Sequence, residues 1–115
     1  MIVAGFGFRQ GATLASLQSA LALTQGAEAI ATAEDKAHAL ADFAHLTGLP
    51  LIAVTKVQLQ AHARPGSPRA KSLYGTGSVA ESAALAAAGP GARLTQPRVT
   101  TPDAQVVIAL AESAP

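Results

Sequence analysis

Residues 73–85 read LYGTGSVAESAAL, a turn with two glycines that leads into an alanine-rich helix. Ser78 stands where a residue caps a helix, and Glu81 follows three residues later, so the pair has the form of a capping box. Each side chain would satisfy a backbone N–H that the first helical turn leaves without a partner. Gly75 and Gly77 let the chain turn tightly and bring its N–H groups close to a ligand.

This turn is a candidate anion-binding site. A helix N-terminus carries a partial positive charge, so residues 75–78, with Thr76 among them, would present their amides to a negative group. The alternative is a well-capped connection that binds nothing. Glu81 is also the best single carboxylate for acid–base chemistry, although capping explains it more simply.

The rest of the chain alternates short apolar runs with helical patterns. We expect strands at residues 2–5, 27–33, 51–54, 93–100 and 105–110, helices at 14–25, 34–47, 56–63 and 79–88, and an extended piece at 72–74. Strands separated by helices favour parallel pairing through crossovers. The sequence therefore predicts one three-layer α/β/α domain, residues 1–115, with a mostly parallel sheet of about five strands.

Composition narrows the classes of function. Cysteine is absent, which excludes disulfides and thiolate chemistry. Polar residues interrupt every apolar run before membrane-spanning length, and the first residues lack the basic segment of a secretory signal. We therefore expect a cytoplasmic protein that binds no membrane.

The charges are unevenly distributed, although the net charge is only +1. No acidic residue lies between Asp42 and Glu81. The same interval holds four basic residues, Lys56, Arg64, Arg69 and Lys71. This basic segment indicates an anionic partner, and a solvated basic loop is the alternative. Nucleic acid is a poor candidate, because the single Tyr offers little stacking and the chain is not strongly basic.

A second glycine-rich turn follows the first predicted strand. Residues 5–11 read GFGFRQG, in which the third glycine comes one residue too late for a dinucleotide fingerprint. What remains is an open turn formed by Gly5, Gly7 and Gly11 around Arg9. The guanidinium can bind a carboxylate in a bidentate manner, and a weak surface ion pair is the alternative.

Ligands of open α/β sheets bind where the strands end, at the carboxyl edge. The loops after the first and third strands and the turn at residues 75–78 should emerge there. We therefore expect Arg9, Lys36 and the basic segment to meet in one groove. The histidines are too far apart along the chain to predict a metal site, and no spacing indicates a Ser–His–acid arrangement or a cofactor. The catalytic residues, if any, are thus unassigned.

Taken together, several stretches resemble one family, the cobalamin-biosynthesis proteins CobE and the C-terminal domain of CbiG. They are VAGFGFRQG at residues 3–11, the segment at residues 35–50 that begins Asp-Lys and ends Gly-Leu-Pro, and GTGSVAESAAL at residues 75–85. The last of these is the most specific. Ser67, which follows a proline-rich turn, and VVIA at residues 106–109 also fit.

The resemblance implies a role in building the corrin ring, with a corrin or precorrin intermediate as the ligand. The ligand contacts that we expect are Gly5, Gly7, Arg9, Gly11, Lys36, Ser67, Gly75, Thr76, Gly77, Ser78 and Glu81. CobE-type proteins have no assigned reaction and would bind or hand on an intermediate. CbiG-type proteins resemble hydrolases that open a lactone on a cobalt-precorrin, which leaves an enzyme as one alternative. A non-catalytic module is another, with other cobalamin-pathway enzymes or a second copy of the chain as partners.

Overall fold

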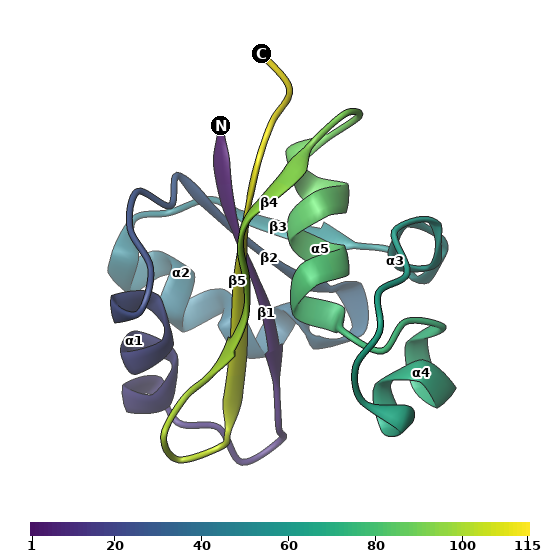
Figure 1. Ribbon diagram of the computed structural model, residues 1–115. Helices are drawn as coiled ribbons and strands as arrows, with labels where there is room; N and C mark the ends of the chain where they lie inside the picture. The colour runs from purple at the N-terminus through teal and green to yellow at the C-terminus, as the bar shows by residue number, and fades with distance from the viewer.

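The computed structural model describes residues 1–115 and contains one five-stranded sheet in the order β3-β2-β1-β5-β4 (Figure 1). The strands are β1 Ile2–Phe8, β2 Ala29–Ala33, β3 Leu51–Val54, β4 Arg93–Thr100 and β5 Val106–Glu112. The helices are α1 Leu14–Ala22, the 3-10 helix η1 Glu34–Leu40, α2 Ala41–Thr47, α3 Lys56–Ala61, α4 Pro68–Tyr74 and α5 Val79–Ala88. None of them has the length and apolar character needed to cross a membrane.

The sheet is mixed. β1, β2 and β3 pair in parallel, whereas β5 runs antiparallel to both β1 and β4. The prediction of an α/β fold with five strands is confirmed, and the prediction of a mostly parallel sheet is wrong. The physical reason is the connection at residues 101–105, which is too short for the crossover that parallel strands require and closes a hairpin between β4 and β5.

Pro97 lies within β4 and does not interrupt it. β4 is an edge strand, so one side of its backbone has no neighbour that needs an N–H donor. The pairing with β5 shifts register on both sides of Gln96, between Leu94 and Gln96 and between Gln96 and Val99. These irregularities accommodate the proline at the edge of the sheet.

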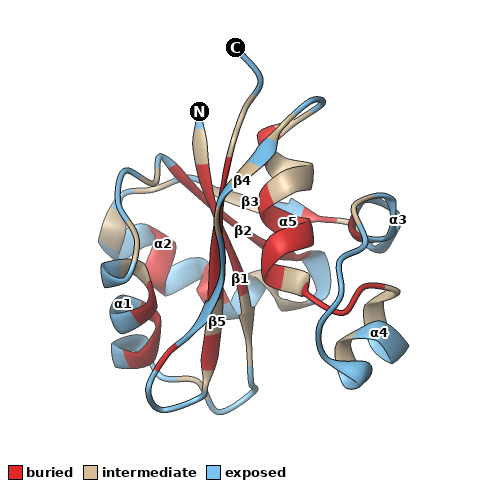
Figure 2. Cartoon of the chain, viewed as in Figure 1, coloured by how far each residue is buried: buried red, intermediate tan, exposed pale blue.

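Alternate side chains of β1 point into two separate core clusters. Phe6 faces the cluster under α1 and α2, where its ring packs edge-on against Phe43 with centroids 5.6 Å apart. Val3 faces the opposite cluster, which α5 covers with alanines. α1 and α2 lie on one side of the sheet and α5 on the other (Figure 1), and burial is concentrated where these helices meet the strands (Figure 2).

The closest approach in this core joins Gly5 to α5. A Cβ at Gly5 would lie 1.9 Å from the carbonyl oxygen of Ala80 and 2.6 Å from the amide nitrogen of Ala84. Gly7 is next on the same side of β1, and a Cβ there would lie 3.6 Å from the amide nitrogen of Ala80. The missing side chains therefore let the backbone of α5 rest directly on β1, with its first turn beside the end of that strand.

Residues 72–74, predicted to be extended, form the end of α4 instead. Ser67 caps this helix by accepting a hydrogen bond from the amide of Ala70 at 3.3 Å, and Pro68 occupies its first turn. Gly75 ends it with a φ of 74°. No residue of α4 is buried (Figure 2), so no apolar stripe marks the helix in the sequence.

Replacing Gly5 by alanine should strongly destabilise the protein. The new methyl group would overlap the Ala80 carbonyl, and overpacking of a filled core lowers the free energy of unfolding by about 3 kcal/mol. Urea unfolding followed by circular dichroism measures this loss. Gly11→Ala is the matched control, because a Cβ at Gly11 meets nothing within 4 Å. Its expected change is below about 0.5 kcal/mol, and equal losses in the two variants would contradict the packing argument.

Candidate functional site

A cavity of about 1030 Å³ opens where the parallel strands end. Its walls come from the end of β1, from η1, from α4, from the first turn of α5 and from the hairpin between β4 and β5. Ligand pockets usually measure about 300–1,000 Å³, so this one has room for a large ligand. Its place at the carboxyl edge is the one that open α/β sheets favour.

Cations dominate the cavity. Its charged residues are one carboxylate, Asp35, and four cations, Arg9, Lys36, Arg69 and Arg98. The ammonium group of Lys36 donates to the carbonyl oxygen of Phe8 at 2.8 Å and lies 5.0 Å from the centre of the Phe8 ring. Arg9 Nε donates to the carbonyl oxygen of Ala104 at 3.3 Å. Both side chains are thus steadied by neutral groups, and their charges stay available to an anion.

Tyr74 and Asp35 join α4 to η1 along this cavity. The Tyr74 hydroxyl donates to the two carboxylate oxygens of Asp35, at 3.2 and 3.1 Å. Partial burial raises the pKa of Tyr74, and the hydrogen bond to Asp35 and its negative charge raise it further. The phenol therefore stays protonated and keeps donating at neutral pH. Apolar side chains complete the wall, namely Phe8, Leu73, Val79 and Val107.

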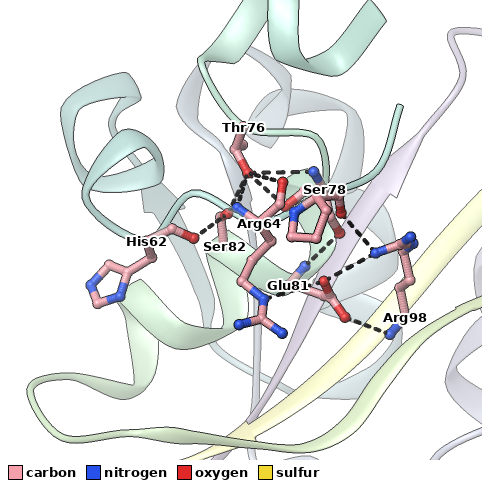
Figure 3. A network of polar contacts seen from close by, with 8 residues as sticks. His62, Arg64, Thr76, Ser78, Glu81, Ser82 and Arg98 are labelled. Carbon is pink, nitrogen blue, oxygen red and sulfur yellow. Dashed lines mark hydrogen bonds and ion pairs between the residues drawn. The ribbon is translucent and has the colours of Figure 1, made fainter. Parts of the chain in front are cut away.

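Glu81 is outside the cavity lining and only 2% exposed. Its Oε2 accepts from the backbone amide of Arg98 at 3.1 Å, and its Oε1 lies 3.3 Å from Arg98 Nη1 and 3.5 Å from Arg64 Nε (Figure 3). Ser78 Oγ caps α5 by accepting from the Glu81 amide at 3.2 Å, but the Ser78 amide turns to Thr76 Oγ1 at 3.4 Å. The predicted capping box is therefore only half formed, because the carboxylate has two arginine partners.

A further buried network fixes the loop between α3 and α4. Thr76 Oγ1 accepts from the Arg64 amide at 2.9 Å and is hydrogen-bonded to Ser82 Oγ at 2.8 Å. Ser82 Oγ in turn donates to the carbonyl oxygen of His62 at 2.7 Å (Figure 3). These bonds hold residues 62–64 against the start of α5. The polar side chains of the predicted turn thus serve the framework behind the cavity.

Comparisons with known proteins bear on this site. The family model described as "Cobalamin synthesis G C-terminus" matches residues 2–111. The chain belongs to this family. The predicted resemblance to CobE and the CbiG C-terminal domain is confirmed. No curated protein matches the chain.

Two crystal structures resemble this member of the CbiG C-terminal family. The first is CobE, "a protein from the cobalamin (vitamin B12) biosynthetic pathway", with 28% identity, a TM-score of 0.84 and coverage of 96% of this chain and 92% of that chain. The second is cobalamin biosynthesis protein chiG from Agrobacterium tumefaciens str. C58, with 32% identity, a TM-score of 0.79 and full coverage of both chains. The fold described above is therefore shared with proteins of cobalamin synthesis.

In this CbiG C-terminal chain, six of the predicted contact residues line the cavity: Gly7, Arg9, Lys36, Ser67, Gly77 and Ser78. Five do not: Gly5, Gly11, Gly75, Thr76 and Glu81. Gly5 is covered by α5, Gly75 ends α4, and Thr76 and Glu81 are consumed in the buried networks. Of the basic segment, Arg69 reaches the cavity, whereas Arg64 and Lys71 line a smaller pocket of about 430 Å³.

Sequence reasoning did not place Tyr74 or Arg98 in the site. Tyr74 is the last residue of α4. The cap residues Ser67 and Gly75 could have predicted this helix, and with it the place of Tyr74 in the cavity wall. Arg98 comes from β4, and only the antiparallel pairing with β5 brings the end of β4 to the edge where β1 ends. The short connection at residues 101–105 is the one local sign of that pairing.

Asp103 fixes the hairpin that brings Ala104 and Gln105 into the cavity wall. Its carboxylate accepts hydrogen bonds from Ser16 Oγ on α1, from Thr101 Oγ1 at 2.5 Å and from the amide of Gln105 at 3.0 Å. The bond from Ser16, followed by those from Thr101 and Gln105, lowers the pKa of Asp103, because these donors favour the charged carboxylate.

A lowered carboxyl pKa contributes stability above the pKa of the unfolded chain, and this contribution disappears as the pH falls through the folded-state pKa. Asp103→Asn should therefore be less stable than the parent at neutral pH. Its stability should also fall less steeply on acidification below about pH 4. Urea unfolding at a series of pH values measures both effects. Glu112→Gln, which breaks an exposed 3.9 Å pair with Arg93, is the control. Parallel stability curves for Asp103→Asn and the parent would exclude this role.

Proposed function

We propose that this protein acts in cobalamin biosynthesis by binding a polycarboxylate corrin or precorrin intermediate, as a carrier or assisting factor. The observation that carries the proposal is the combination of four cations, one carboxylate and an apolar wall in a single large cavity. The pathway is supported by the family and by the two related structures, both described as cobalamin-biosynthesis proteins.

The chemistry of the ligand fits the two kinds of wall. Corrin intermediates are flat macrocycles with carboxylates around the edge. Guanidinium groups bind carboxylates through paired, charge-assisted hydrogen bonds. Arg9, Arg69 and Arg98 line the cavity and would bind the ligand in this way. Apolar side chains such as Leu73 and Val107 would cover the face of the ring, which removes apolar surface from water.

Binding is better supported than lactone hydrolysis. Glu81, the carboxylate that the sequence suggested for acid–base chemistry, is 2% exposed and pairs with Arg64 and Arg98. A general base must reach the proton that it removes, and Glu81 is not in the cavity lining. A cytoplasmic location and an association with other pathway enzymes or with a second copy remain predictions.

The first test is a thermal melt with hydrogenobyrinic acid, a corrin that carries peripheral carboxylates. A ligand that binds only the folded state stabilises it by about 2.7 kcal/mol at a hundred times its Kd, so the Tm should rise with concentration. Arg9→Met should weaken binding about tenfold, because it removes a charge-assisted hydrogen bond. Lys56→Met is the matched control, since Lys56 lines neither pocket. No Tm shift at ligand well above micromolar, or equal losses in both variants, would exclude the proposed site.

Asp35→Asn should tighten the binding of polycarboxylates. Asp35 is the only carboxylate in the cavity, and its negative charge repels the carboxylates of a ligand. We expect the Kd for uroporphyrin, a fluorescent polycarboxylate macrocycle, to fall several-fold. Fluorescence titration measures it, with Asp42→Asn as a control that removes a negative charge from outside the cavity. Weaker binding by Asp35→Asn would contradict the repulsion.

A further inference from the structure

We infer that Glu81 is a positioning residue for the ligand, because it holds the guanidinium of Arg98 at the cavity wall without entering the cavity itself. The inference rests on the proposed function and names the mechanism by which one cation of the site is oriented. Glu81 belongs to α5 and Arg98 to β4, and their side chains meet (Figure 3). Arg98 lines the cavity, whereas Glu81 does not.

Arg98 is fixed at three points. Its backbone amide donates to Glu81 Oε2 at 3.1 Å, and its Nη1 donates to Glu81 Oε1 at 3.3 Å and to the carbonyl oxygen of Pro65 at 2.8 Å. The side chain is nevertheless 44% exposed. Nε and Nη2 make no hydrogen bond within the chain, so they remain free to bind a carboxylate in the cavity.

The other cations of the cavity have no carboxylate partner. Among Arg9, Lys36, Arg69 and Arg98, only Arg98 forms an ion pair, and its partner Glu81 is almost fully buried. A free arginine side chain loses about 2 kcal/mol of rotamer entropy when a ligand immobilises it. Because Glu81 immobilises Arg98 before binding, less of this entropy is lost when the ligand arrives.

Stability alone does not account for this arrangement. A buried carboxylate is costly unless it is paired, and a buried ion pair contributes little net stability relative to apolar side chains of the same size. The residues that α5 buries are mainly alanines, and Glu81 is the one charged residue among them. The Glu81 carboxylate instead fixes the orientation of two guanidinium groups, those of Arg98 and Arg64.

A double-mutant cycle tests the inference, with the Kd for hydrogenobyrinic acid and for uroporphyrin as the readout. E81Q keeps the shape of the side chain and removes its charge, and R98M removes the guanidinium. We expect each single change to weaken binding about tenfold, and the double variant to bind no more weakly than R98M alone. Combined with R9M, E81Q should still weaken binding by its own full factor, since Arg9 does not contact Glu81.

The outcomes separate the two proposals. If the parent chain binds neither macrocycle, the proposed function fails and the positioning role fails with it. If the parent binds and E81Q leaves the Kd unchanged, the positioning role alone is overturned. It is also overturned if E81Q weakens the R98M protein as much as it weakens the parent, because Glu81 would then act through the general fold.

A second variant covers the case in which E81Q does not fold. R98K keeps a positive charge at the cavity but lacks the fork that joins Glu81, Pro65 and the ligand. We expect it to weaken binding about tenfold, with no change in the melting temperature of the unliganded protein beyond that of the control Arg93→Lys. Binding equal to that of the parent would overturn the inference.

Discussion

The contact between Gly5 and the first turns of α5 is the constraint on which the rest of the structure depends. Helices normally stand off a sheet by the length of their side chains, but here the backbone of α5 rests on β1. That position puts Ser78 and Val79 in the cavity wall and leaves Glu81 facing β4 and the loop after α3. The part of the cavity wall that α5 supplies, and the position of Glu81 beside Arg98, are therefore consequences of how closely this helix packs.

Features of the fold that depend on neighbouring residues, such as helix caps and helix ends, were predicted well. α5 spans Val79–Ala88, as its cap and its closing glycine indicated, because capping and helix ends depend on neighbouring residues alone. The direction of β5 was not predicted, since an apolar run has the same composition whichever way it pairs. The shortness of the 101–105 connection was the only local sign of a hairpin. α4 was missed for a different reason: none of its residues is fully buried, so its sequence has the caps of a helix without a periodic apolar stripe.

Only the part of the site that follows the parallel strands could be predicted from the sequence. Arg9 and Lys36 follow strands that end at one edge, and that reasoning brought them together correctly. Glu81 shows where such reasoning stops. Its spacing from Ser78 has the form of a capping box, yet its carboxylate binds Arg98, which is 17 residues away, and Arg64. A sequence motif such as the capping box predicts only partners that are near in the chain. A buried carboxylate binds the strong donors that the fold brings close to it, here two arginines.

The net charge of the chain does not predict the charge of its cavity, because all but one of the acidic residues lie outside the cavity lining. Glu81 pairs with Arg64 and Arg98, and Glu28 accepts a hydrogen bond from the amide of Ile2 at 3.0 Å. Asp103 holds a hairpin, and Glu112 faces Arg93. Asp35 is the one carboxylate that lines the cavity, and of the four cations there only Arg98 has an ion-pair partner, Glu81, behind the wall. A chain with a formal charge of +1 thus gathers four cations around one cavity at the edge of its sheet, an arrangement that favours an anionic ligand.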